Sequence, residues 1–123
     1  MQQILERSCG LDIHKDTIEA CILINKGATE PEVVRESFTT LRGDLIRLRD
    51  WLTNHSCLNV AMESTGVFWM LVYEVLEEVG YFDLSVVNAR HMQNVPGRKT
   101  DQNDAEWIAS LHICGLLNKS FVP

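Results

Sequence analysis

The sequence predicts an α/β protein in which helices flank a mixed five-stranded sheet. Two observations lead to this prediction. Three strand-like segments come first, and helix-like and strand-like segments alternate after them. The chain also has 123 residues, of which 46% are hydrophobic, and this is enough for one domain with a modest core. We therefore expect residues 1–123 to form a single domain.

The first three segments predict an antiparallel meander. Residues 8–14 and 17–25 are largely apolar and are joined by a tight link. A turn at Asn25-Lys26-Gly27 then leads to a third strand from Glu32 to Phe38. Short connections of this kind join antiparallel neighbours.

A helix is predicted to open at Thr40, where Thr39 or Thr40 can cap its first turn. Its apolar residues recur at helical spacing. They are Leu41, Leu45, Leu48 and Leu52. This stripe is the face that we expect to pack on the sheet.

The middle of the chain predicts a strand, a helix and another strand. Leu58 to Met62 is a continuous apolar run, which is typical of a strand covered on both faces. Thr65-Gly66 leads into a helix that ends at Gly80, a residue suited to a helix terminus. Phe82 to Val87 then supplies the fifth strand.

The last part predicts a polar loop over residues 88–99 and a third helix from about Asp101 to Leu117. Strands separated by a crossover helix lie parallel to their neighbours. The complete order of elements matches the ribonuclease-H-like architecture. In that architecture the first strand is central.

Four carboxylates lie where a metal-dependent nuclease would need them. They are Asp12, Glu63, Asp101 and Asp104. Asp12 and Glu63 lie in or at the end of apolar runs, where an uncompensated carboxylate is costly. A divalent cation compensates for this cost, and hard oxygen ligands suit magnesium or manganese.

Each acid also has a structural explanation. Asp12 alone can be a turn residue at a strand end, and Glu63 alone can cap the following helix. Asp101 can be an N-cap, and acids in a first helical turn interact favourably with the helix dipole. These explanations do not account for the acids falling at places that one topology brings together.

A single requirement covers all four acids. Two divalent ions, Mg²⁺ or Mn²⁺, need several carboxylates, one of which bridges both ions. Such ions activate a nucleophile and stabilise the leaving oxygen during phosphodiester attack. In a ribonuclease-H-like sheet Asp12 would be the bridging acid, and Glu63, Asp101 and Asp104 would complete the two sites.

The charge distribution points to local rather than general nucleic-acid contact. The net charge of −6 argues against a surface that coats nucleic acid. Arg90, Arg98 and Lys99 nevertheless lie in a window without acids just before Asp101, and we expect them to contact phosphate. The alternative is that these basic residues form an ordinary solvated surface. No apolar run approaches a membrane span, and the N-terminus lacks the features of a signal peptide. We therefore expect a cytoplasmic protein with no membrane partner.

Three blocks of the sequence resemble the signatures of the DEDD transposases, the recombinases of insertion-sequence family 110 and its invertase relatives. The blocks are Gly10 to Lys15, Met62 to Gly66 and Lys99 to Ala105, and they keep the order Asp, Glu, Asp, Asp. The resemblance covers nearly the whole chain. It implies a RuvC-like N-terminal domain, a divalent-metal site and DNA recombination guided by a structured RNA.

Members of that family continue into a C-terminal part that carries a nucleophilic serine and further nucleic-acid contacts. We therefore expect this chain to be a fragment of a longer transposase, inactive alone and homo-oligomeric in its full-length form. A Holliday-junction-resolvase-type nuclease would use the same acids on the same fold. A kinase-like domain of the actin superfamily would need a glycine-rich phosphate turn after Asp12, which is missing. A non-catalytic nucleic-acid-interaction domain would bind no magnesium, so metal titration separates it from the enzymes.

Overall fold

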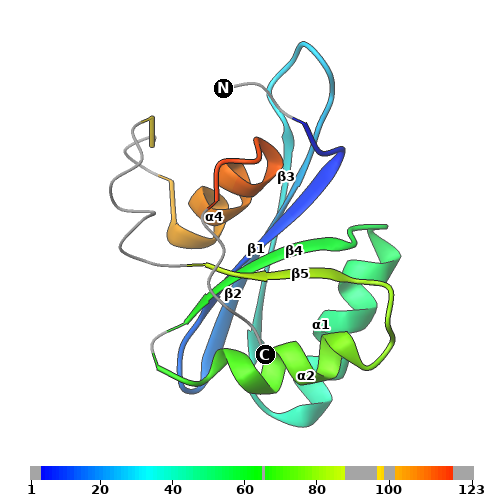
Figure 1. Cartoon of the computed structure of the whole chain (residues 1–123), viewed down its shortest axis with the longest axis vertical. Coiled ribbons are helices and arrows are strands. Elements are labelled where there is room, and N and C mark those ends of the chain that lie inside the picture. Colours follow the sequence, from blue (N-terminus) through cyan, green and yellow to red (C-terminus); the bar gives the residue numbers. More distant parts are fainter. Residues whose placement is uncertain (1–3, 65, 88–96, 99–101, 118–123) are drawn as a thin grey trace.

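A computed structural model describes residues 4–64, 66–87, 97–98 and 102–117 (Figure 1). They form one five-stranded sheet in the order β3-β2-β1-β4-β5. The strands are β1 (Arg7–Ile13), β2 (Thr17–Ile24), β3 (Glu32–Thr39), β4 (Asn59–Ser64) and β5 (Asp83–Val86). The helices are α1 (Arg42–Asn54), α2 (Trp69–Glu77) and α4 (Asp104–Ile113).

The pairing of the strands confirms the predicted mixed sheet. β1 and β2 are antiparallel, as are β2 and β3, so the first three strands form the expected meander. β4 lies parallel to β1, and β5 lies parallel to β4. β1 is therefore the central strand, and its two neighbours run in opposite directions.

The helices cover the two faces of the sheet, with α1 and α2 on one side and α4 on the other (Figure 1). The alternation of side chains along β1 decides which residue meets which helix. Cys9, Leu11 and Ile13 belong to the core under α1 and α2. The residues between them, including Gly10 and Asp12, face α4.

The face under α1 and α2 holds the larger core. Its fully buried side chains are mostly branched and apolar, from strands and helices alike, and they include Leu11, Ile18, Ile22, Leu48, Leu52, Val60, Met62 and Leu76. Leu41 was expected in this stripe, but it is 73% exposed. It precedes the helix as the N-cap residue, and so its side chain does not share the buried face of α1.

Neither threonine caps α1, contrary to the sequence prediction. The N-cap residue Leu41 offers no side-chain acceptor, and the Thr40 hydroxyl donates to the Lys15 carbonyl instead. The carboxylate of Asp44, in the first turn, accepts a hydrogen bond from the Thr39 N–H at 2.7 Å. The helix start is therefore tied to the end of β3 through Asp44.

α4 packs so closely on β1 that its backbone touches the strand. A Cβ atom placed on Gly10 would lie 2.2 Å from the Ala105 carbonyl oxygen and 2.6 Å from the Ala109 nitrogen. The Ser8 hydroxyl also donates to the Ala109 carbonyl at 2.9 Å. Only glycine permits this approach, which sets the position of α4 relative to β1.

Two helices are shorter than the sequence predicted. α2 begins at Trp69 rather than near Gly66, and the Ser64 hydroxyl accepts a hydrogen bond from the Trp69 N–H. Gly80 lies three residues beyond the end of α2, with a positive φ of 81°. Its N–H bonds to the Glu77 carbonyl, so it reverses the chain after the helix rather than ending the helix itself.

α4 was expected from about Asp101 to Leu117, but it spans Asp104–Ile113. Asn103 is its N-cap, because the Asn103 side chain accepts a hydrogen bond from the Glu106 N–H at 2.7 Å. Gly115, with a φ of 71°, turns the chain away at the other end. Asp101 is therefore not the cap of this helix.

Candidate metal-binding site

Asp12 and Glu63 lie side by side at the carboxyl ends of β1 and β4. The two residues are register partners in the parallel pairing of these strands. Partners in neighbouring strands project to the same side of a sheet. Both side chains therefore lie on the face covered by α4, as the predicted architecture requires.

The carboxylate of Asp12 is buried and only half satisfied. The residue is 8% exposed, and its Oδ2 atom lies 3.2 Å from the His14 Nε2 atom. Its Oδ1 atom is shielded from solvent and has no hydrogen-bond donor in the described part of the chain, unless Glu63 carries a proton. A buried anionic oxygen without a donor is unfavourable, so this atom calls for a proton or a cation.

Burial and the neighbouring charge of Asp12 raise the pKa of Glu63 to about 7. A hydrogen bond with Asp12 and the charge of Asp104 raise this pKa further, while His14 lowers it. Two carboxylates this close cannot both hold their charge at low cost. Near neutral pH the pair therefore either shares a proton or binds a positive ion.

Asp104 is the first residue of α4, and its charge reaches Glu63 as one of the causes of the raised pKa. Its own Oδ1 atom lies 2.8 Å from a guanidinium nitrogen of Arg98. Among the residues that the structure describes, no three His, Cys, Asp or Glu side chains come together closely enough to hold a metal ion. Asp104 therefore lies near the Asp12–Glu63 pair without joining it.

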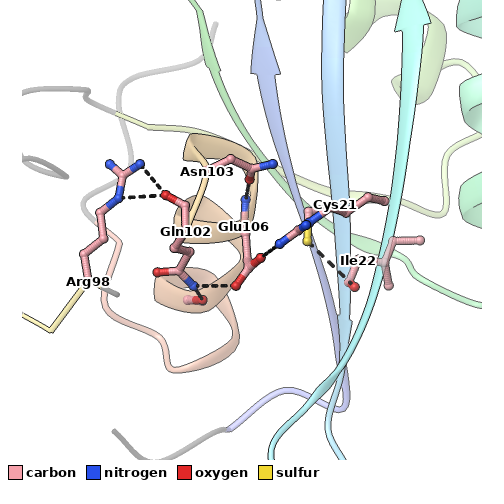
Figure 2. Close-up of polar contacts among 8 residues, drawn as sticks. Cys21, Ile22, Arg98, Gln102, Asn103 and Glu106 are labelled. Carbon is pink, nitrogen blue, oxygen red and sulfur yellow. Dashed lines mark hydrogen bonds and ion pairs between the residues drawn. The ribbon is translucent and has the colours of Figure 1, made fainter. Parts of the chain in front are cut away.

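Polar contacts hold the start of α4 in place (Figure 2). Arg98 donates two hydrogen bonds to the Gln102 carbonyl, at 2.7 and 3.2 Å. The Gln102 side chain donates to Glu106 at 3.0 Å and to the Ser110 hydroxyl at 2.8 Å. Glu106 in turn forms an ion pair with Arg35 on β3. The first turn of α4 is thus anchored both to the segment before it and to the sheet.

The family is decided by a sequence match that covers nearly the whole chain. The family model for the DEDD transposases of insertion-sequence family 110, described as "Transposase", matches residues 9–123. The chain belongs to this transposase family. The resemblance seen in the three sequence blocks is therefore confirmed. No curated protein sequence matches the chain.

Solved structures confirm the RuvC-like fold of this transposase-family chain. RuvC of Thermus thermophilus in complex with a Holliday junction substrate superposes with a TM-score of 0.68 at 14% identity, covering 94% of this chain and 100% of that one. A second Thermus thermophilus RuvC structure gives a TM-score of 0.64 at 11% identity, with 93% and 99% coverage. The Fowlpox virus resolvase with Holliday junction DNA gives 0.53 at 11% identity, with 87% and 94% coverage. At these identities the similarity establishes the fold.

The remaining predicted site residues of the transposase-family chain are only partly described. Asp101, Arg90 and Lys99 lie outside the described residues. Arg98 is described, and its half-exposed side chain engages Asp104. Within the described residues, no helix is both long and apolar enough to cross a membrane.

Two residues near the acids were not singled out from the sequence. Glu19 is the antiparallel partner of Asp12 and so lies on the same face, where its exposed carboxylate accepts a hydrogen bond from the Ser37 hydroxyl at 2.7 Å. His14 bonds Asp12 directly. The alternation of polar and apolar residues in Thr17 to Ala20 places Glu19 on the polar face, but only the register with β1 places it opposite Asp12.

The residues present fit a divalent cation. Asp12 and Glu63 supply hard oxygen donors, and Asp12 Oδ1 is a buried acceptor in need of a positive partner. Burial and the neighbouring charge of Asp12 raise the pKa of Glu63, and a cation would offset both effects. Magnesium and manganese both favour such an oxygen-rich site.

Proposed function

We propose that this chain is the catalytic domain of a DNA transposase that cleaves and transfers phosphodiester strands with the help of divalent metal ions. The observation that carries the proposal is the Asp12–Glu63 pair. These carboxylates are partners on neighbouring strands, and one buried oxygen has no donor in the described chain unless Glu63 carries a proton. Structural acids would be expected to have such donors already.

Two ions of Mg²⁺ or Mn²⁺ would be held by four carboxylates, those of Asp12, Glu63, Asp101 and Asp104. When bound, the ions would activate the nucleophile and stabilise the leaving oxygen. The protein's own contribution is position. β1 and β4 place Asp12 and Glu63 in register, and His14 bonds one oxygen of Asp12. The close contact of α4 with Gly10 brings the start of that helix towards the pair.

DNA is the proposed substrate, and a structured guide RNA is the proposed partner. Arg98 pairs with Asp104 through a half-exposed guanidinium, a group suited to binding phosphate oxygens. Arg90 and Lys99 are proposed to contact phosphate with it. We further propose that the full-length protein is cytoplasmic and homo-oligomeric. We also infer a C-terminal part that contributes the nucleophilic serine to this catalytic domain.

The test is a strand-cleavage assay with Mn²⁺ that compares residues 1–123 with a version extended through the C-terminal part. We expect Asp12-dependent cleavage only in the longer protein, because a metal site without its nucleophile and its grip on substrate loses most of the positioning that catalysis needs. Asp12→Asn in the longer protein should abolish cleavage. The matched control is Asp83→Asn, which changes an exposed carboxylate at the start of β5.

A second candidate is a water-using nuclease of the resolvase type. The observation that favours it is the superposition on RuvC, which covers 100% of that chain without any additional domain. Robust, Asp12-dependent cleavage by residues 1–123 alone would select this candidate over the transposase. An absence of cleavage by both proteins would contradict the catalytic proposal.

A further inference from the structure

Arg98 forms an ion pair with Asp104. Among the described residues, Asp104 is the predicted site acid that lies outside the Asp12–Glu63 pair. The Arg98 guanidinium lies 2.8 Å from the Asp104 Oδ1 atom and also holds the Gln102 carbonyl through two hydrogen bonds. Both carbonyl and carboxylate are therefore tied to one cationic group just before α4. A carboxylate paired in this way already has the positive partner that a metal ion would otherwise supply.

The ion pair between Arg98 and Asp104 is weak enough to be replaced by another contact of Arg98. The side chains of Arg98 and Asp104 are 40% and 57% exposed. Ion pairs exposed to this degree contribute little to stability and are screened by solvent. A phosphate group can form a stronger, bidentate contact with the same guanidinium. Nucleic acid that reaches Arg98 would therefore compete directly with Asp104.

Asp104 is close enough to respond if it is released. The carbonyl oxygen of the next residue, Ala105, closes on Gly10, which lies two residues before Asp12 on β1. The charge of Asp104 is also among the causes that raise the pKa of Glu63, and the described side chains do not form a three-ligand group. Asp104 is the first residue of α4, and this helix is fixed against β1 by its contacts with Gly10 and Ser8. The backbone position of Asp104 is therefore set. The proposed release therefore moves the Asp104 side chain while its backbone stays in place.

We propose that Arg98 is a substrate-operated switch for the metal site. Without nucleic acid, Arg98 holds the Asp104 carboxylate. When a backbone phosphate takes the guanidinium, Asp104 is released and becomes a further ligand for the ion held by Asp12 and Glu63. Binding of metal and binding of nucleic acid thereby favour each other. This inference rests on the proposed metal site and specifies how that site is regulated.

The experiment measures Mn²⁺ affinity by titration calorimetry, with and without a short DNA duplex. In the parent chain the duplex should tighten Mn²⁺ binding, and Mn²⁺ should tighten DNA binding by the same factor, because linkage is reciprocal. In Arg98→Gln, Mn²⁺ alone should bind roughly two- to fivefold more tightly than in the parent, since an exposed ion pair no longer competes. The effect of DNA on Mn²⁺ affinity should also be lost. Arg42→Gln is the matched control, because Arg42 forms an exposed ion pair with Glu78 between α1 and α2.

Asp104→Asn shows whether the released carboxylate is the ligand. Adding Asp104→Asn to Arg98→Gln should cancel the gain in Mn²⁺ affinity. Circular dichroism would reveal whether Arg98→Gln perturbs α4. In that case Arg98→Lys, which keeps the charge without the planar guanidinium, should give an intermediate Mn²⁺ affinity. Unchanged or weaker Mn²⁺ binding in Arg98→Gln, or a gain that persists in the double variant, would overturn the switch. Parent-like Mn²⁺ binding in Asp12→Asn would instead overturn the proposed metal site.

Discussion

The two faces of the sheet are built in different ways. The face under α1 and α2 is filled by large apolar side chains such as Leu11, Leu48 and Leu52, which are fully buried. The face under α4 has small or polar residues along β1, where Gly10 lets the helix backbone touch the strand. Asp12 lies on this α4 face, near the carboxyl end of β1.

The difference shows how one sheet can serve stability on one side and a site on the other. A core of interlocking side chains stabilises the fold, but its side chains can adjust when one of them changes. Backbone-to-backbone contact leaves far less room for adjustment. We infer that this backbone contact fixes the distance between α4 and the ends of β1 and β4. The acids that must keep a fixed spacing lie on this face.

The largest expected effect comes from removing volume on the α1 and α2 face. Leu52→Ala should lower the free energy of unfolding by about 3 kcal/mol, because Leu52 is fully buried and the cavity cannot collapse completely. Chemical denaturation measures this change. Leu41→Ala is the control, since that leucine is exposed and should cost little. Equal costs at the two positions would contradict the difference in packing.

Adding volume on the α4 face should have the next largest effect. Gly10→Ala should cost about 2 kcal/mol, because its new Cβ would collide with backbone atoms of α4 rather than with a flexible side chain. Gly43→Ala in α1 meets nothing within 4 Å. It should be neutral or stabilising by about 0.5–1 kcal/mol, as expected for alanine in a helix. A Gly10→Ala protein as stable as the parent would show that α4 does not rest on β1.

Metal bound at the acidic end of the α4 face should stabilise the folded chain. At 10 mM Mg²⁺ and a millimolar Kd, binding to the native state adds about 1.4 kcal/mol. The Tm should therefore rise with Mg²⁺ in the parent and hardly at all in Asp12→Asn. Differential scanning calorimetry measures the two responses. The same rise in both proteins would place the metal elsewhere.

The smallest expected effect is the pH dependence that Glu63 contributes in the absence of metal. Its pKa is about 7 in the folded chain against an ordinary value of 4.5, so the folded state binds the proton more tightly. Stability from this group is fully present below about pH 4.5 and falls as the pH rises to about 7. Because solvent screens this partly exposed group, we expect about 1 kcal/mol or less.

Glu63→Gln should flatten this slope when unfolding is followed in EDTA between pH 4.5 and pH 8. The exposed Glu78→Gln is the matched control and should keep the parent slope. A parent-like slope in Glu63→Gln would mean that Glu63 is not the group that resists ionisation. The pairing with Asp12 would then not carry the electrostatic strain that distinguishes the α4 face.

The sequence by itself determined the order of the elements, the mixed sheet and the identity of the central strand. The apolar run of β1, the early alternation of β2 and the helical spacing of Leu45, Leu48 and Leu52 are local patterns, and the structure follows them. The sequence also predicted that Asp12 and Glu63 lie at the ends of neighbouring strands, as they do, while their role as metal ligands stays a prediction. Connection lengths decide whether neighbouring strands run parallel, and parallel register brings equivalent ends together.

The tertiary structure decided the details that depend on distant contacts. Asn103 is the N-cap of α4, and Arg98 holds Asp104 through a contact that no local pattern predicts. Glu19 becomes a neighbour of Asp12 only through strand register. The pKa of Glu63 is likewise raised by burial and by a charge far away in the chain. Hydrophobic periodicity records which face of an element is buried, whereas the position of one polar atom depends on which other segments reach it.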